Sequence, residues 1–211
     1  MTYLCSLLEL PRSYPSGLLL GMSAHTLVRV ATAEIETAIG PMIAAASETH
    51  LLLFEFPRRR MIDTQLERVR RAHDCELAPG ESPVFAMLRT QLDEYFRGER
   101  RDFTVPLHVP GTQFQTRVWS ELQRIPCGTT TSYTRLAASI GQPNAVRAVA
   151  RANGDNRIAI LIPCHRVIGS NGELVGYGGG LWRKKKLLEL EGRTETLNLF
   201  GGRAQPREGR D

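Results

Sequence analysis

The pair Cys164-His165 is the part of this sequence best suited to covalent chemistry. A cysteine attacks as a thiolate, and its ordinary pKa leaves little thiolate at neutral pH, so a neighbouring base or cation is the usual activator. Adjacent residues on a strand point to opposite faces, so His165 would reach the sulfur only at a turn or through one bridging water. A histidine in this role needs a third group to fix its tautomer. The candidate carboxylates downstream are Glu173, Glu189 and Glu191.

The residues around this pair strengthen the case for chemistry. On its own, a free cysteine is more often a buried structural residue, and a Cys-His pair is more often structural than catalytic. Here Pro163 stiffens the chain before the cysteine. Tyr177 stands in a glycine-rich stretch, where it could stack on or hydrogen-bond a planar ligand. Glycines let a backbone come close to a ligand, although a plain flexible loop is their commoner use. The glycines here are Gly176, Gly178, Gly179 and Gly180.

The composition is that of an ordinary soluble protein and excludes several classes. No apolar run approaches the length of a membrane span, and residues 1–20 lack the basic region of a secretory signal. The four cysteines include no Cys-x-x-Cys pair, which argues against a zinc site, and they are too sparse for a disulfide scaffold. We therefore expect a cytoplasmic protein without a metal, in a reducing compartment where Cys164 stays a free thiol.

The charge is concentrated in the segment that carries the cysteine. The net charge is +5, and between Arg147 and Lys186 the only acidic residues are Asp155 and Glu173. A run of charge is often just a solvated face, but an excess beside a candidate nucleophile favours nucleic acid as the partner. The basic residues of this segment are Arg147, Arg151, Arg157, Arg166, Arg183, Lys184, Lys185 and Lys186.

The first half of the chain has the pattern of a small α+β domain over residues 34–108, preceded by an extension, 1–33, of unknown role. Residues 27–35 could form a strand at the domain edge. A hairpin is predicted from the apolar runs 42–46 and 51–56. Two amphipathic helices follow, with apolar positions Ile62, Leu66 and Val69 in the first and Phe85, Leu88, Leu92 and Phe96 in the second. We find no chemistry in this half.

The second half, residues 109–192, is predicted to be mostly helical. Thr112 caps a first helix, and Ser132 caps a second that runs to about residue 140. A turn with Gly141 leads to a third, alanine-rich helix over residues 144–153. Helix, short glycine turn and helix are the pattern of a helix-turn-helix, although an ordinary helical hairpin is commoner; the small side chains favour close approach to a duplex. A last helical stretch ends at Glu191, and the tail, 193–211, is predicted to be disordered.

These motifs together resemble the O6-alkylguanine-DNA alkyltransferase family, the methylated-DNA–protein-cysteine S-methyltransferases. The resemblance rests on Pro-Cys-His-Arg-Val at 163–167, Gly-Tyr at 176–177 and Arg-Lys-x-x-Leu-Leu-x-x-Glu at 183–191. It covers residues 111–192 clearly and 37–103 more weakly. It implies an α+β N-terminal domain followed by a mostly α, winged-helix-like C-terminal domain with the helix-turn-helix. It also implies transfer without a cofactor.

The resemblance also implies roles for individual residues. Cys164 matches the alkyl acceptor, His165 the water-linked base and Glu191 the carboxylate that orients it. Tyr133 matches a tyrosine that assists nucleotide rotation, and Arg147 matches the arginine that fills the gap left by the extruded nucleotide. We expect further DNA contacts from Arg151 and Arg166. The other expected binding residues are Asn156, Tyr177, Gly178, Gly179 and Lys184.

The implied activity is direct repair of duplex DNA. An alkyl group moves from O6-alkylguanine, and also from O4-alkylthymine, to Cys164, and the stable thioether limits each molecule to one turnover. The partner is double-stranded DNA bound through its minor groove, and the protein is expected to be a monomer. Two residues near the site depart from the pattern of some members, because Gly178 replaces a serine and Ala159 replaces a proline; Trp182 lies nearby. These departures bear on the tolerance for bulky adducts.

Two other readings stay open at this point. A non-transferring alkyltransferase-like module would bind DNA without chemistry, but such relatives lack the acceptor cysteine. A cysteine hydrolase would use Cys164 and His165 with a glutamate, and it would gain nothing from Arg147 and Tyr133.

Overall fold

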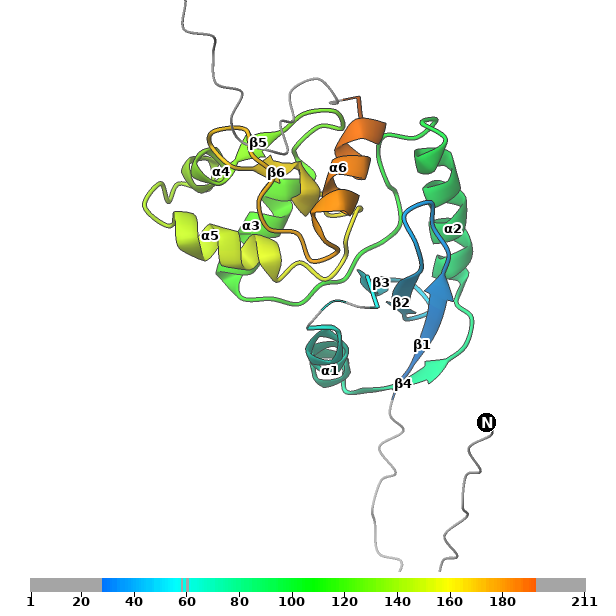
Figure 1. The fold of residues 1–211 in the computed structure, drawn as a ribbon. Coiled ribbons are helices and arrows are strands. Elements are labelled where there is room, and N and C mark those ends of the chain that lie inside the picture. Colours follow the sequence, from blue (N-terminus) through cyan, green and yellow to red (C-terminus); the bar gives the residue numbers. More distant parts are fainter. Residues whose placement is uncertain (1–27, 58, 60, 193–211) are drawn as a thin grey trace, which may run out of the picture.

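The computed structural model describes residues 28–57, 59 and 61–192. Most of the predicted N-terminal extension and the whole predicted tail lie outside the described residues. The described chain forms an N-terminal sheet with two helices and a largely helical C-terminal part (Figure 1). The predicted fold class is therefore confirmed.

The N-terminal part is built on a four-stranded sheet in the order β3-β2-β1-β4. Its strands are β1 (Val28–Ile35), β2 (Met42–Ala46), β3 (Leu51–Glu55) and β4 (Cys75–Pro79). The predicted hairpin is confirmed, because β2 and β3 pair antiparallel. The prediction for β1 is wrong in one respect, because β1 lies between β2 and β4 rather than at the edge.

The fourth strand, β4, was missed in the sequence. It covers only Cys75–Pro79 and runs directly into the turn residues before Pro83. The sequence pattern that would predict a strand here is therefore short and is cut off by turn residues. It pairs parallel with β1. The chain reaches β4 from β3 through a crossover helix, α1 (Ile62–His73), and this crossover lets β4 run parallel to β1. Tertiary pairing therefore decides this strand more than local pattern does.

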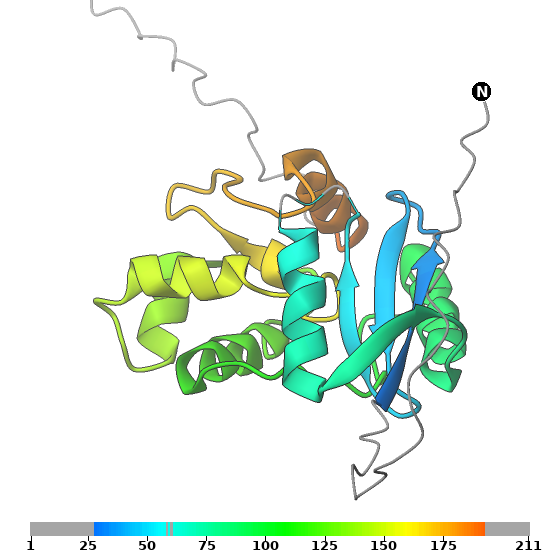
Figure 2. The ribbon, with the colours of Figure 1, turned by 90° about the horizontal axis from the view of Figure 1, so that it is seen from below.

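Two helices cover opposite faces of the sheet (Figure 2). The first, α1, packs its Val69 with Leu52 and Leu53 of the sheet. The second, α2 (Pro83–Phe96), begins at Ser82, whose hydroxyl accepts from Val84 N at 3.2 Å, and it has proline at its first position. Its apolar face belongs to the larger core, which continues into the C-terminal part.

The C-terminal part confirms the predicted helices. They are α3 (Gln113–Gln123), α4 (Tyr133–Ser139), α5 (Val146–Gly154) and α6 (Leu181–Leu190). A small parallel pair joins β5 (Thr131–Ser132) to β6 (Val167–Ile168). Ser132 caps α4 as predicted, because its hydroxyl accepts from Arg135 N at 3.1 Å. No helix in the described part of the chain is long and apolar enough to cross a membrane.

The helices α4 and α5 form the predicted helix-turn-helix pair and both contact α3. Gly141 in the turn has φ +72°, a left-handed conformation that glycine adopts without a steric penalty. Val149 and Ala152 of α5 face the core, whereas Arg147 and Arg151 are exposed. Since these two arginines are one helical turn apart, they lie on the same outer face.

The two halves are joined through the edge strand β3. Phe54 N donates to Arg157 O at 2.9 Å, and Ala159 N donates to Phe54 O at 2.8 Å. The segment that leads to Cys164 therefore extends the N-terminal sheet, which also covers an otherwise open strand edge. A proline at position 159 could not make the second of these bonds.

The cap of α3 gives a test of the fold. Thr112 accepts from Gln115 N at 3.2 Å, and Gln115 Oε1 accepts from Thr112 N at 3.0 Å. Losing this reciprocal pair in Thr112→Ala should lower the free energy of unfolding by about 1 kcal/mol. Thr116→Ala, in the exposed interior of the same helix, is the matched control and should leave stability unchanged or slightly raised. Equal effects of the two variants in urea denaturation would contradict the capping role.

Candidate active site

Cys164 opens a short 3-10 turn, Cys164–Arg166, between a buried apolar segment and β6. It is 8% exposed and lines a pocket of about 180 Å³. Because Cys164 and His165 lie on this turn, His165 is not held on the opposite face of a strand from the cysteine. The other lining residues are Glu55, Arg59, Tyr133, Ala150, Asn153, Gly154, Asn156, Ala159, Gly176, Tyr177 and Gly178.

The thiol of Cys164 needs help to ionise. Burial raises its pKa, while a hydrogen bond with the Asn156 side chain and the nearby Lys184 and Arg59 act in the opposite direction. A base close to Cys164 is therefore required for nucleophilic attack at neutral pH.

Among the described residues, Cys75 and Cys127 are also free thiols. No cluster of histidine, cysteine or acidic residues in this part of the chain could hold a metal ion.

Asn156 fixes the backbone that leads to the cysteine. Its side-chain amide donates to Ile162 O at 2.9 Å and to Ile158 O at 3.3 Å, and its Oδ1 accepts from Ile158 N at 3.0 Å. These bonds enclose Ile160, which has φ +73°, an uncommon conformation for a β-branched residue. Such strain persists where the surroundings over-determine the chain. Asn156, which the resemblance gave as a binding residue, lines the pocket and also supports this backbone.

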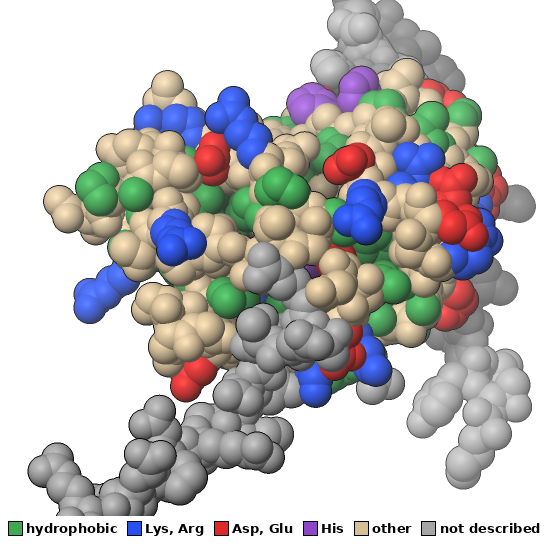
Figure 3. All heavy atoms as spheres, turned by 90° about the horizontal axis from the view of Figure 1, so that it is seen from above, with side chains coloured by type: hydrophobic (Ala, Val, Ile, Leu, Met, Phe, Trp, Pro, Cys, Tyr) green, Lys and Arg blue, Asp and Glu red, His purple; other side chains and the backbone are tan. Residues whose placement is uncertain are grey.

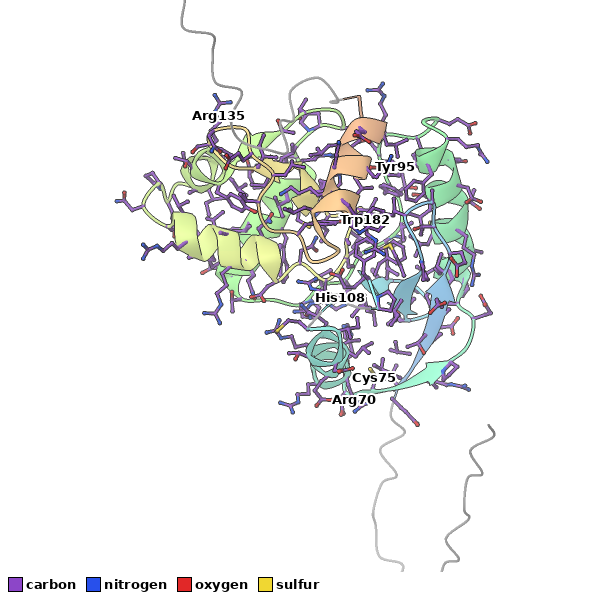
Figure 4. The ribbon with its side chains drawn as sticks, in the orientation of Figure 1. Arg70, Cys75, Tyr95, His108, Arg135 and Trp182 are labelled. Atoms are coloured by element: carbon purple, nitrogen blue, oxygen red, sulfur yellow. The ribbon has the colours of Figure 1, made fainter. Side chains whose placement is uncertain are left out.

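Glu191, directly after α6, is the centre of a buried hydrogen-bond network. His165 Nε2 lies 2.9 Å from Glu191 Oε1. Arg166 binds both carboxylate oxygens, with Nε and Nη2 each at 2.9 Å. Tyr95 of α2 donates its hydroxyl proton to Oε1 at 2.8 Å, and Gly128 N donates to Oε2 at 3.2 Å. Figure 4 shows Tyr95 between α2 and α6. Glu191 is thus the carboxylate that the histidine uses.

The network sets the protonation states of its members. Burial alone would raise the pKa of Glu191, but hydrogen bonds from His165 and Arg166, with their charges, hold that pKa well below its usual range. Burial lowers the pKa of His165, although Glu191 opposes this shift. A neutral imidazole must carry its proton on Nε2 to donate to Glu191. Nδ1 is then an acceptor, and it has no hydrogen-bond partner among the described residues.

Two predicted binding residues prove to be internal supports. Arg166 is 6% exposed and donates to Ile125 O at 2.6 Å in addition to Glu191, so its guanidinium does not face a DNA partner. Lys184 is fully buried and donates to Val167 O and Val175 O, each at 2.6 Å. Burial lowers the pKa of Lys184 to about 8, against the influence of Cys164. It does not line the pocket, and its direct contacts fasten the glycine-rich loop to β6.

Tyr133 and Tyr177 line the pocket with their hydroxyls protonated. Burial and the neighbouring Cys164 raise the pKa of Tyr133 to about 12, and they raise that of Tyr177 well above its usual value. The Tyr133 hydroxyl lies 3.5 Å from Asn153 Nδ2. The Tyr177 hydroxyl is buried without a hydrogen-bond partner in the described chain, and its ring meets the edge of Phe56 with centroids 6.0 Å apart. Both residues can therefore donate a hydrogen bond to a ligand in the pocket.

Of the glycine-rich loop, Gly176, Tyr177 and Gly178 line one side of the pocket, whereas Gly179, also expected as a binding residue, does not. A Cβ at Gly179 would lie 2.4 Å from Cε2 of the buried Phe56, so a side chain there cannot be accommodated without moving the ring.

Beyond the loop, Trp182 is 54% exposed at the start of α6 (Figure 4). Arg183 stacks between two aromatic rings, 4.6 Å from that of Phe56 and 4.3 Å from that of Trp182.

The outer surface near the pocket is basic. Figure 3 shows Lys and Arg side chains predominating on the left of the molecule, the side of α4 and α5, whereas acidic and basic side chains mix on the right. Arg135, Arg147 and Arg151 are exposed on these two helices. Figure 4 shows Arg135 pointing outward from α4. Because Ala150, Asn153 and Gly154 of α5 also line the pocket, this basic face adjoins its entrance.

Comparison with known proteins assigns both halves of the chain. A family model described as "6-O-methylguanine DNA methyltransferase, DNA binding domain" matches residues 113–193, and one described as its "ribonuclease-like domain" matches residues 30–109. A methylated-DNA–protein-cysteine methyltransferase from Mycobacterium leprae is 46% identical over 157 residues, or 74% of this chain and 89% of the relative. The constitutive enzyme of that name from Bacillus subtilis is 40% identical over 153 residues, covering 72% of this chain and 89% of its own.

Solved structures agree. The crystal structure of Mycobacterium tuberculosis O6-methylguanine methyltransferase matches with a TM-score of 0.66 and 41% identity over 79% of this chain and 94% of that chain. The structure of M. tuberculosis OGT in complex with DNA matches with a TM-score of 0.65 and 44% identity, covering 78% and 92%. This chain belongs to the O6-alkylguanine-DNA alkyltransferase family. The resemblance seen in the sequence and the enzyme class that it implied are confirmed.

The structure adds three residues of the N-terminal domain to this alkyltransferase site. Tyr95 binds Glu191, while Glu55 and Arg59 line the pocket with Cys164. The prediction that this domain carries no chemistry is therefore wrong. One signal was present in the sequence: Glu55 is the only charged residue of the apolar strand β3, and a buried carboxylate needs a partner. Nothing local indicated that Tyr95 faces Glu191, from which it is 96 residues distant.

The Glu191 network can be tested by stability measurements. Glu191→Gln leaves Arg166 buried without its carboxylate, so the free energy of unfolding at neutral pH should fall by about 3 kcal/mol. Since the pKa of Glu191 is lower in the folded than in the unfolded protein, its contribution is present above the unfolded pKa of about 4.3 and is lost as the pH falls further. Urea denaturation at several pH values should show the gap between wild type and variant narrowing in acid.

Glu189→Gln is the matched control for that experiment. Glu189 is two residues away and forms only partly exposed ion pairs with Lys185 and Lys186, at 3.5 and 3.6 Å. Pairs of this kind contribute about 0–1 kcal/mol. A gap for Glu191→Gln that stayed constant down to pH 3 would show that its carboxylate charge is not what stabilises the fold.

Proposed function

We propose that this protein repairs duplex DNA by transferring an alkyl group from O6-alkylguanine, and from O4-alkylthymine, to Cys164. One observation supports this proposal more strongly than the others. The sulfur lies in a small pocket next to the helix-turn-helix, and two neutral tyrosines line the walls of this pocket. His165, the residue after the cysteine, is hydrogen-bonded to Glu191. Family membership supplies the reaction class, and this arrangement supplies the residues that perform it.

The first step is ionisation of the thiol. His165 keeps Nδ1 free as an acceptor while Nε2 is held by Glu191, so a single water between Nδ1 and the sulfur would complete a proton path. The lowered pKa of His165 keeps the imidazole neutral and able to accept at pH 7. The ionised Glu191 then stabilises the imidazolium that forms, as an orienting carboxylate does in a catalytic triad.

The second step is a single in-line displacement. The thiolate of Cys164 attacks the alkyl carbon, the bond from that carbon to O6 breaks, and its electron pair remains on O6. The guanine departs as an anion unless a proton reaches it. The Tyr133 hydroxyl and the backbone N–H groups around Tyr177 and Gly178, residues that line the pocket, would stabilise that charge. The thioether product is stable, so each molecule reacts once, and the transfer needs no cofactor.

Access to the pocket requires the damaged nucleotide to leave the duplex. A base inside a helix cannot reach a sulfur that is 8% exposed, so we infer nucleotide flipping. The exposed Arg147 and Arg151 of α5 would lie in the minor groove, with Arg147 filling the vacated space. We propose that the protein acts as a monomer and in the cytoplasm.

Transfer can be tested by mass spectrometry. The intact protein is mixed with excess duplex DNA that contains O6-methylguanine, and the modified peptide is then sequenced. We expect the mass to rise by one methyl group per molecule, located on Cys164. Cys164→Ala should gain no mass while still binding DNA, and Cys127→Ala, which removes another free thiol, should react normally. Tight DNA binding by the wild type without any mass change would instead indicate a module that only binds.

The role of Arg147 can be separated from the chemistry by changing the substrate. Arg147→Ala should slow repair of duplex DNA far more than reaction with the free base O6-benzylguanine, because only the duplex requires the gap to be filled. Arg89→Ala, an exposed arginine of α2 paired with Glu81, controls for loss of one positive charge. If Arg147→Ala slows both substrates equally, the assignment is overturned.

A further inference from the structure

Arg59, four residues after the end of β3, is the one cationic side chain among the residues that line the Cys164 pocket. Its side chain is 10% exposed and forms an ion pair with the buried Glu55. Its Nη1 also donates to Asn156 O at 2.7 Å, and its Nη2 donates to Gly154 O. The N-terminal domain therefore places a guanidinium, with its partner Glu55, in a pocket whose cysteine, tyrosines and asparagines come from the C-terminal domain.

The guanidinium of Arg59 occupies the space beside Gly178. A Cβ at position 178 would lie 3.0 Å from Arg59 Nε, 3.1 Å from Cζ and 3.2 Å from Cδ. Three nearly equal distances mean that this Cβ would sit over the Nε end of the guanidinium. Glycine at 178 therefore allows Arg59 to pack against the loop, where a serine would compete with it for the same space.

The guanidinium still has donors to offer a ligand. It carries five N–H bonds, and the acceptors within the described residues engage Nη1 and Nη2 but not Nε. Glu55 balances its positive charge, so any effect on a ligand would come from directed hydrogen bonds more than from net charge. Such preorganised donors stabilise a developing anion most strongly in a site from which water is excluded.

We propose that Arg59 is a catalytic residue that donates a hydrogen bond to the departing guanine. This inference rests on the proposed function. As the bond from sulfur to the alkyl carbon forms and the bond from that carbon to O6 breaks, the electron pair left on O6 spreads over the purine ring. Arg59 stabilises that charge through its remaining N–H groups until water supplies the proton. It thereby replaces the side-chain donor that Gly178 lacks.

The decisive experiment measures the reaction of the full-length protein with O6-benzylguanine. In Arg59→Ala the maximal rate of inactivation should fall by about a hundredfold, as when one oxyanion donor is removed, with a much smaller change in the concentration for half-maximal rate. Iodoacetamide alkylates Cys164 without releasing guanine, so its rate reports only the ionisation of the thiol, which the charge of Arg59 favours, and it should fall far less than a hundredfold. Equal losses with both reagents would mean that Arg59 acts on the thiol through Asn156, and the proposal would fall.

Two further variants guard against a merely structural effect. Arg68 of α1 also reaches the end of α5, with Nη1 3.5 Å from Asp155 Oδ1, but it does not line the pocket. Arg68→Ala should therefore react at the wild-type rate. The double variant Glu55→Gln/Arg59→Ala leaves no unpaired buried carboxylate, and it should fold and still show the slow transfer. Recovery of the wild-type rate in this double variant would overturn the proposal.

Gly178→Ser supplies an independent check by a double-mutant cycle. Alone, the serine should displace Arg59 and slow transfer. Combined with Arg59→Ala, it has room for its hydroxyl, and the double variant should react faster than Arg59→Ala alone. Additive slowing would contradict the exchange of one donor for the other. If the wild type itself transfers no alkyl group, the proposed function fails; if the wild type transfers and Arg59→Ala matches it, only this inference fails.

Discussion

The buried carboxylate of Glu191 is the interaction on which the rest of the site depends. It joins α6 to the cysteine turn through His165 and Arg166, and to the N-terminal domain through Tyr95. A buried charge is costly unless its partners satisfy it, and here they do so well that its pKa falls despite burial. The same carboxylate fixes the tautomer of His165. Both the packing of the fold and the proposed catalysis therefore require an ionised carboxylate at this position.

The joint between the domains is the second constraint. The edge strand β3 hydrogen-bonds the segment that precedes Cys164, and Asn156 holds that segment around the strained Ile160. Arg59 reaches across the same joint to the carbonyls of Asn156 and Gly154. The N-terminal domain is thus a wall of the active site as well as a support for it.

Much of this molecule follows from local pattern. The hairpin, the capped helices α3 and α4 and the helix-turn-helix were predicted because capping residues, glycine turns and apolar spacing act over a few residues. The position of β1 and the existence of β4 were not, because a strand's neighbours depend on pairing between distant segments. Arg166 and Lys184 show the same limit of local sequence pattern, which does not indicate whether a charged side chain is buried. Their charge suggested ligand binding, and their burial against Glu191 and against backbone carbonyls makes them supports.

The sequence by itself determined which groups are available for chemistry. Cys164, His165 and Glu191 occur at spacings typical of one family, and their types favour nucleophilic chemistry at the sulfur. The tertiary structure alone decided which groups meet. Arg59 and Asn156 are 97 residues apart in the chain, yet their contact closes the pocket. Local spacing carries no information about such contacts, because the free energy that forms them comes from burying both domains in one core.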